Sequence, residues 1–417
     1  MSHTPENTKI FFITGTQYQF LVADIYARYI YDKYNIRSTV IHSYFPNFDI
    51  SRFNTNGKYT LLLYTYNNKN VIGKCIFSLQ CGYLFPFSKW KKLFDSDHRI
   101  ITFIFTDLNK LADRLADLTK QINENNLVYL IEEGNLTYED PSELRMNHEK
   151  LWYIKHKLTK ILFGIERRSK VIGDNPLIDG VIVKNPERYG KLEKSKGKQI
   201  IQQDKDIMLL SGDFAEHYGS AAKDLHCDIL YLGDPHYRNG KYFEAEDECI
   251  SSILSAIPSE LSVLLKPHPR DLIEKYDNII KNFDNVRITD KETAVIPIEP
   301  LIEIVNPKAV IAIESTATIT LANMYPDLKS FVMKNIPEAS VMFEKLIDAG
   351  EEVPHFGDDV YQGENDNIFI PDSLEEFHKM LREIAAEPEK KLKLMKKHSG
   401  TFDEIDMLLS SNAAQVS

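Results

Sequence analysis

Ser262-Val263-Leu264-Leu265-Lys266-Pro267-His268-Pro269-Arg270-Asp271 is the stretch of the 417-residue chain that points most directly to its fold. The short apolar run predicts a buried strand that Pro267 ends, and residues 270–283 then show the apolar spacing of a helix. His268 is therefore predicted at a strand-to-helix junction. In an open parallel sheet such junctions line the crevice where ligands bind, and an imidazole there can donate to a phosphate. On its own, the segment slightly favours a plain turn histidine between two prolines.

The same alternation of apolar runs and helical spacing extends through both halves of the chain. It predicts an α/β fold with mostly parallel sheets. The polar, lysine-rich stretch 185–205 is the best candidate for a linker. We therefore expect an N-terminal domain at 1–203, a C-terminal domain at 204–372, and C-terminal helices at 373–417 that could pack back on the N-terminal domain. The main strands are predicted at residues 9–14, 38–43, 59–64, 99–105, 126–131, 207–210, 228–232, 262–266 and 308–313.

The composition is that of an ordinary globular protein, with 43% hydrophobic and 27% charged residues. A polar N-terminus and the lack of any run of 18 apolar residues predict a cytoplasmic protein without a spanning helix. The cysteines form no Cys-x-x-Cys pair, which argues against a zinc knuckle or a redox motif and suits a reducing compartment. They are Cys75, Cys81, Cys227 and Cys249.

Charge is divided unevenly between the two halves. Residues 1–203 contain 29 Lys and Arg against 21 Asp and Glu, whereas residues 204–417 contain 21 against 40. A basic half indicates an anionic partner such as an acidic polysaccharide, a lipid head group or a membrane surface. Chance clustering on exposed helices would give the same counts. Residues 142–170 show the spacing of a basic amphipathic helix that could lie on an anionic membrane, although a solvated helix face is more usual.

Three loops with chemically useful side chains follow predicted strands. Glu132-Glu133 could supply a general base, because burial and mutual repulsion raise the pKa of one carboxyl of such a pair. Ser315-Thr316 opens a helix, where hydroxyls cap the helix and can also bind an anion. Together with His268 it could grip one phosphate, and Glu299, before another helix, could bind a ribose. Each loop also has a plain explanation as a surface turn, an N-cap or an acidic helix start.

In this order, Glu132-Glu133-Gly134, His268-Pro269 and Ser315-Thr316 resemble the motifs of the bacterial GT-B-fold sialyltransferases and polysialyltransferases. The resemblance implies two Rossmann-like domains facing each other across a cleft. It implies an inverting, metal-independent glycosyltransferase without a cofactor, which moves sialic acid from CMP-sialic acid to a glycan hydroxyl. The acceptor would be an anionic or sialylated capsule or lipooligosaccharide chain, which could be lipid-linked. No nucleic acid partner is implied, and peripheral contact with the inner face of the membrane stays open.

The resemblance also assigns roles to residues. Glu132 would deprotonate the acceptor hydroxyl with Glu133 as its neighbour, and His268 would donate to the CMP phosphate. The sequence departs from the family pattern in having Glu-Glu where Asp is frequent, and a mixed Ser-Thr pair. Both differences retain a carboxylate or a hydroxyl. The remaining implied residues are Ser315, Thr316, Glu299, Lys266, Pro269, Ser211 and Gly212 around the donor, and Thr16 and Gln17 on the acceptor side.

Three other functions remain open from the sequence. A transferase could use a CDP or CMP donor to move glycerol phosphate or Kdo. A nucleotide-sugar epimerase would share the two-domain form but would release UDP. A glycan-binding protein without activity would keep the basic half and the fold alone. Donor specificity and nucleotide release distinguish these functions.

Overall fold

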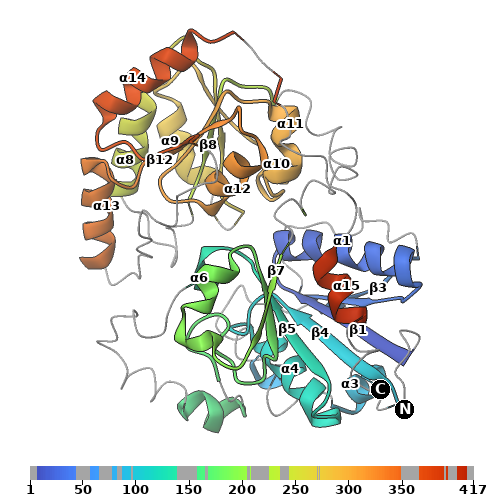
Figure 1. Cartoon of the computed structure of the whole chain (residues 1–417). Helices are drawn as coiled ribbons and strands as arrows, with labels where there is room; N and C mark the ends of the chain where they lie inside the picture. Colours follow the sequence, from blue (N-terminus) through green and yellow to red (C-terminus); the bar gives the residue numbers. More distant parts are fainter. Residues whose placement is uncertain are drawn as a thin grey trace. The chain divides into compact units, whose positions relative to one another are not determined.

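The computed structural model contains two compact α/β units. Unit 1 comprises Met1–Leu210 and Ser399–Ser417, and unit 2 comprises Ser211–His398. Figure 1 shows their helices and strands. The structure describes residues 7–43, 57–64, 78–81, 87–94, 97–138, 157–164, 168–203, 207, 225–234, 244–269, 271, 273–348, 366–388, 391–392 and 402–410.

Sheet A, in unit 1, is parallel throughout its described strands, in the order β3-β2-β1-β4-β5-β6-β7. The strands are short apolar runs, which suits a sheet covered on both faces. The order reverses between β1 and β4, so the crevice for ligands is expected at the carboxyl ends of these strands. The bounds are β1 (Thr8–Thr14), β2 (Thr39–Ser43), β3 (Thr60–Tyr64), β4 (Arg99–Ile104), β5 (Leu127–Ile131), β6 (Gly180–Val183) and β7 (Gln199–Gln202).

Helices cover both faces of sheet A. On one face, α3 and α4 share a buried core with the strands. On the other, Tyr26 of α1 stacks with Phe12 of β1 and meets the ring of Phe402 edge-on. Tyr26 also donates to Glu404 of α15 at 2.7 Å, so the last helix lies beside the first (Figure 1). The bounds are α1 (Gln17–Tyr34), α3 (Phe87–Leu93), α4 (Lys110–Ile122) and α15 (Asp403–Ser410).

Sheet B, in unit 2, has the order β10-β9-β8-β11-β12-β13 and is also parallel throughout its described strands. Its order reverses between β8 and β11, which places a second crevice at their carboxyl ends. The bounds are β8 (Ile229–Leu232), β9 (Val263–Lys266), β10 (Val286–Ile288), β11 (Ala309–Ala312), β12 (Lys329–Val332) and β13 (Ile368–Phe369).

One face of sheet B shares a buried core with α8, α9, α13 and α14. On the other face, Val332 packs against Ile319 of α12. The predicted C-terminal helices are therefore divided, because α14 belongs to unit 2 and α15 to unit 1. The bounds are α8 (Glu244–Ser255), α9 (Asp277–Ile280), α10 (Lys291–Ala294), α11 (Ile302–Val305), α12 (Thr316–Met324), α13 (Pro337–Asp348) and α14 (Leu374–Ala385).

The prediction of a two-domain α/β protein with parallel sheets is confirmed, but the linker prediction is wrong. Residues 185–205 contain α6 (Pro186–Gly190), the 3-10 turn η4 (Glu193–Ser195) and β7, which pairs with β6. A short edge strand with one solvated face has too few apolar residues to stand out from a loop.

Two helix predictions also need correction. The helix expected from residue 270 begins at Ile273 as a 3-10 turn, η6 (Ile273–Tyr276), and continues as α9. It begins late because the Asp271 N–H closes a turn to the His268 carbonyl at 2.8 Å. Of residues 142–170, residues 157–163 are helical and 168–170 are not, and much of the remainder lies outside the described residues. In the described part of the chain, no helix is long and apolar enough to cross a membrane.

Candidate active site

Glu132 lies directly after β5, at the carboxyl edge of sheet A, and is 4% exposed. Its Oε2 accepts hydrogen bonds from the Tyr138 hydroxyl and, at 2.6 Å, from the Lys184 backbone N–H. Among the described residues, its Oε1 has no hydrogen-bond partner. The carboxylate is therefore fixed by one oxygen, and the other oxygen remains able to accept a proton.

Glu133 links two loops at the same edge. The Thr16 hydroxyl donates to Glu133 Oε1 at 3.3 Å, although β1 and β5 are separated by β4 in the sheet. Thr16 also caps α1 by accepting from the Gln19 N–H at 3.3 Å, and Gln17, in the first turn of that helix, is 8% exposed. The structure thus brings together the predicted base, its neighbour and the predicted acceptor-side residues.

Two cations from the segment after β6 lie near this group. The Arg188 guanidinium lies over the ring of Tyr138, 4.8 Å from its centroid. The Lys184 ammonium is 6.0 Å from the centroid of Tyr18, in the first turn of α1. Contacts of this kind keep a cation beside an aromatic face without neutralising its charge. Positive charge therefore accompanies the acidic pair, although sequence reasoning did not single out either cation.

The predicted donor residues of unit 2 lie on neighbouring strands. His268 follows β9 and Ser315 precedes α12 after β11, with β8 between the two strands. Two strand spacings separate such positions by about 10 Å. The Ser315 hydroxyl accepts from the Ala317 N–H at 3.4 Å, so its role as an N-cap is confirmed. Both loops flank the point where the strand order of sheet B reverses.

Gly233, after β8, allows the His268 loop to approach closely. Its N–H donates to the Lys266 carbonyl at 2.9 Å. A Cβ at this position would collide with the Tyr276 hydroxyl and lie 3.3 Å from the His268 nitrogen. Glycine is therefore required by space at this position, independently of its backbone conformation.

A buried ionic cluster lies under the same loop, and we define it as Asp234, Glu246, Asp271 and Lys275. The Lys275 ammonium contacts Glu246 at 2.7 Å and Asp271 at 2.6 Å, with all three side chains at most 3% exposed. Asp271 also accepts from the Tyr276 hydroxyl at 2.7 Å. Burial raises the pKa of Glu246 to about 7, although Lys275 opposes the shift.

Asp234 connects this cluster to the Ser315 loop. Its Oδ2 accepts from the backbone N–H groups of Ile313 and Glu314, both at 3.1 Å. Burial raises the pKa of Asp234 to about 6, while the two N–H groups and Lys275 oppose the shift. The sequence alone did not indicate Asp234.

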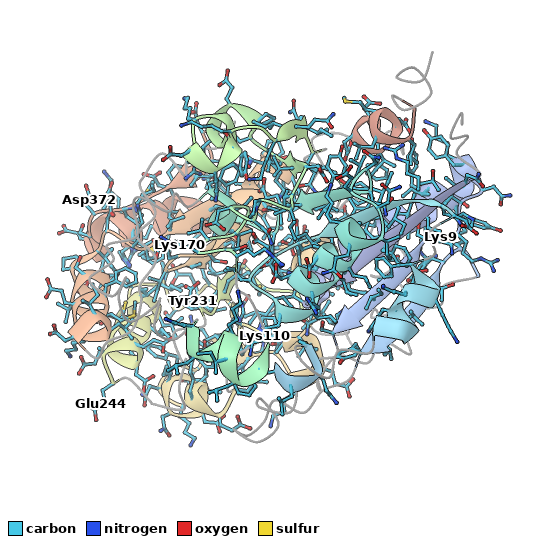
Figure 2. All side chains as sticks on the ribbon, turned by 90° about the horizontal axis from the view of Figure 1, so that it is seen from below. Lys9, Lys110, Lys170, Tyr231, Glu244 and Asp372 are labelled. Carbon is cyan, nitrogen blue, oxygen red and sulfur yellow. The ribbon has the colours of Figure 1, made fainter. Side chains whose placement is uncertain are left out.

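Figure 2 helps to locate this region: the labelled Tyr231 lies on β8, three residues before Asp234, and the exposed Glu244 begins α8.

Lys266 and Glu299 lie near one another in the interior of unit 2. The Lys266 ammonium donates to the Ala294 carbonyl at 2.9 Å and is 5% exposed. Burial lowers the pKa of Lys266 to about 8, and the charge of Glu299 opposes this shift. Through its hydrogen bond to Ala294, Lys266 holds the segment that leads to Glu299, the first residue of η7 (Glu299–Leu301).

The predicted residues thus form two groups, one in each unit. Pro269 is partly exposed beside His268. Ser211 and Gly212 lie outside the described residues. Across the described ranges, no three His, Cys, Asp or Glu side chains form a group that could hold a metal ion.

A family model matches a large part of the chain. Residues 87–334, more than half of the chain, match the family model described as alpha-2,8-polysialyltransferase. No curated protein sequence matches the chain.

Solved structures resemble the chain at low sequence identity. The UDP-GlcNAc 2-epimerase of Methanocaldococcus jannaschii shares 11% identity at a TM-score of 0.56, over 97% of this chain and 99% of that one. The UDP-GlcNAc 2-epimerase of Neisseria meningitidis shares 10% identity at a TM-score of 0.50, over 90% of this chain and 99% of that one. The GT-B domain of a Photobacterium damselae sialyltransferase shares 14% identity at a TM-score of 0.48, over 81% of this chain and 96% of that one. At these identities the likeness concerns the fold alone.

Proposed function

The chain belongs to the alpha-2,8-polysialyltransferase family, and we propose that it is a GT-B-type glycosyltransferase that transfers sialic acid from CMP-sialic acid to a glycan hydroxyl. The observation that carries the proposal is the buried Glu132 at the carboxyl edge of sheet A, which is held by Oε2 while its Oε1 has no hydrogen-bond partner among the described residues. A carboxylate held in this way is equipped to receive a proton.

In the proposed reaction, Glu132 accepts the proton of the acceptor hydroxyl. The acceptor oxygen forms a bond to the anomeric carbon of the sugar from the face opposite CMP, and the bond from that carbon to the phosphate oxygen breaks. CMP leaves with the electron pair of that bond, so the configuration inverts. No metal ion takes part, because CMP bears less charge than a nucleoside diphosphate and protein donors can stabilise it.

We assign the donor to the crevice of sheet B. His268 would donate to the phosphate as CMP leaves, and Ser315 and Thr316 would hold the same phosphate at the start of α12. Glu299 would accept hydrogen bonds from the ribose. The position of these loops beside the reversal of strand order supports the assignment.

We further propose an anionic glycan as the acceptor. The support is the excess of basic residues before residue 204, together with Lys184 and Arg188 near Glu132. Attraction between exposed charges weakens as salt screens it. The KM for a sialylated acceptor should therefore rise when it is measured at salt concentrations from about 50 to about 300 mM. An acceptor KM that is independent of salt would contradict this part of the proposal.

A membrane contact on the cytoplasmic face is proposed for the helix over residues 157–163. Its Leu158, Ile161 and Leu162 are 50%, 60% and 59% exposed, and Lys157 and Lys160 lie on the same short helix. Apolar side chains beside lysines suit the surface of an anionic bilayer. Sedimentation with phosphatidylglycerol vesicles should be lost when the three apolar residues are replaced by Ser. Equal sedimentation of the variant would exclude this surface.

A donor screen tests the function itself. The chain should release CMP from CMP-sialic acid in the presence of a sialylated acceptor and lengthen that acceptor by mass spectrometry. Turnover of CDP-glycerol or CMP-Kdo instead would identify another transferase, and release of UDP from UDP-GlcNAc would identify an epimerase. Absence of turnover with every donor would favour a glycan-binding protein.

A further inference from the structure

The hydroxyl of Tyr138 is oriented by its neighbours. Tyr138 ends η3 (Asn135–Tyr138), directly after the acidic pair, and is 6% exposed. Its oxygen accepts from the Asn185 N–H at 2.9 Å, and its proton is donated to Glu132 Oε2. Burial, followed by the charge of Glu132, raises the pKa of Tyr138 far above its usual range. The phenol therefore stays protonated and acts as a donor.

The second donor to Glu132 is the Lys184 backbone N–H. A backbone N–H can only donate, and that of Lys184 points to the same Oε2 at 2.6 Å. A proton placed on Oε2 would face both donors, whereas among the described residues Oε1 faces none. A proton taken from an acceptor is therefore best carried by Oε1.

The ring of Tyr138 is held from the next segment of the chain. Arg188 of α6 lies over one face of the ring, and Tyr189 meets the ring with centroids 6.4 Å apart at 72°. The same segment supplies the N–H of Asn185. One stretch after β6 therefore fixes the phenol, and the phenol fixes the carboxylate.

From these contacts we propose that Tyr138 is a positioning residue for the reaction: it holds Glu132 by Oε2, so that Oε1 alone receives the acceptor proton. The inference rests on the proposed role of Glu132 as the base. Hydrogen bonds to a carboxylate favour its ionised form. Tyr138 contacts Glu132 directly, Glu133 is its neighbour in the chain, Lys184 reaches it through its backbone N–H, and Arg188 lies over the Tyr138 ring.

Tyr138→Phe removes the donor and keeps the ring. We expect kcat to fall about 10- to 100-fold, which is the usual effect of a lost hydrogen bond to a charged group. The KM for CMP-sialic acid should stay unchanged, because the donor is assigned to unit 2. A kcat within a few-fold of the wild type, or a KM for CMP-sialic acid that changes as much as kcat, would overturn the proposal.

Tyr129→Phe is the matched control. It removes the same atom from a buried tyrosine of β5 whose hydroxyl donates to Gln199 Oε1 at 2.8 Å, and its kcat should stay within a few-fold of the wild type. If Tyr138→Phe fails to fold, Arg188→Met tests the same contacts from a partly exposed position. It should lower kcat by a smaller amount, and an unchanged kcat in this variant would contradict the role of the Arg188 contact.

A measurement without substrates separates this inference from the proposed function. The Lys184 amide, observed by NMR in the full chain labelled with 15N-lysine, reports the hydrogen bond to Glu132 Oε2. Its chemical shift should change in Tyr138→Phe and stay unchanged in Tyr129→Phe. An unchanged Lys184 amide in Tyr138→Phe would overturn the positioning role even if transfer is found. If the NMR result holds but no CMP-sialic acid is consumed, the proposed function fails alone.

Discussion

At the carboxyl edge of sheet A, Glu132 accepts hydrogen bonds from a phenol and a backbone N–H, and no described side chain forms an ion pair with it. At the same edge of sheet B, Asp271 and Glu246 share the ammonium of Lys275. Neutral donors hold a carboxylate in place but allow it to gain and lose a proton. A buried ammonium holds its partners in position, because separating a buried pair is costly.

The difference indicates a division of tasks. Under the proposed function, Glu132 at the edge of sheet A is the group that accepts a proton. At the edge of sheet B, the ionic cluster joins the loops after β8, β9 and β11 and holds them in position. We therefore expect substitutions in unit 1 to change proton transfer first, and substitutions in the cluster of unit 2 to change stability and donor binding first.

The largest effect is expected for Lys275→Met. It leaves Glu246, Asp271 and Asp234 buried without their cation, and breaking a buried pair in this way costs about 3–5 kcal/mol. The loss should be smaller at pH 6 than at pH 8, because Glu246, whose pKa burial raises to about 7, can then take up a proton. Urea unfolding measures it. Lys291→Met removes an exposed pair with Glu274 and should change nothing measurable, so equal losses would contradict the comparison.

His268→Ala should lower the rate of CMP release about 10²- to 10³-fold, as is typical for the loss of one donor to a developing negative charge. The melting temperature should stay within a few degrees of the wild type, because His268 is only partly buried. His226→Ala is the control, since His226 is exposed and precedes β8 at the opposite edge of the sheet. A retained rate in His268→Ala would remove the donor assignment from this loop.

Gly233→Ala should destabilise the chain by about 1–3 kcal/mol, because the new methyl group collides with the Tyr276 hydroxyl. Adding Tyr276→Phe removes the obstructing oxygen, so the double variant should be more stable than the two separate losses predict. Gly190→Ala is the control: its Cβ would lie 3.6 Å from Ile200. Strict additivity of the two losses in denaturation would show that the collision is not the cause.

The smallest effect concerns pH. Burial raises the pKa of Asp234 to about 6, so between about pH 4 and 6 the folded chain keeps a proton that the unfolded chain releases. The stability contributed by this group therefore falls as pH rises through that window. Asp234→Asn should gain a few degrees in melting temperature relative to the wild type from pH 4 to 7. Asp228→Asn should show no such trend, because hydrogen bonds from Ser262 and Lys308 outweigh burial and lower the pKa of Asp228. If the difference in melting temperature between Asp234→Asn and the wild type is the same at every pH from 4 to 7, the predicted effect of Asp234 is contradicted.

Short apolar runs ended by polar or turn residues made much of both sheets predictable from the sequence. The strands that precede Glu132, His268 and Ser315 are all found, and so is the helix that Ser315 caps. Local spacing carries this information because a strand buried on both faces must be apolar throughout.

The supporting residues could not be predicted in the same way. The N–H groups of Lys184 and Asn185 reach Glu132 and Tyr138 only through the pairing of β5 with β6. Asp234 reaches the Ser315 loop only through the pairing of β8 with β11. No local pattern records which strands become neighbours. The late start of the helix after His268 has a local cause instead, because Asp271 is engaged by Lys275, four residues later, and by the turn to His268.

Glu132→Gln tests the division of tasks most directly. The amide keeps the size of the carboxyl but cannot serve as a base, and general base catalysis contributes about 10²- to 10⁴-fold. Sialic acid transfer is measured with a sialylated acceptor, and CMP binding is measured by calorimetry on the same sample. We predict that transfer falls by that factor while CMP binding is unchanged. Transfer within a few-fold of the wild type, or loss of CMP binding in a folded variant, would contradict the account.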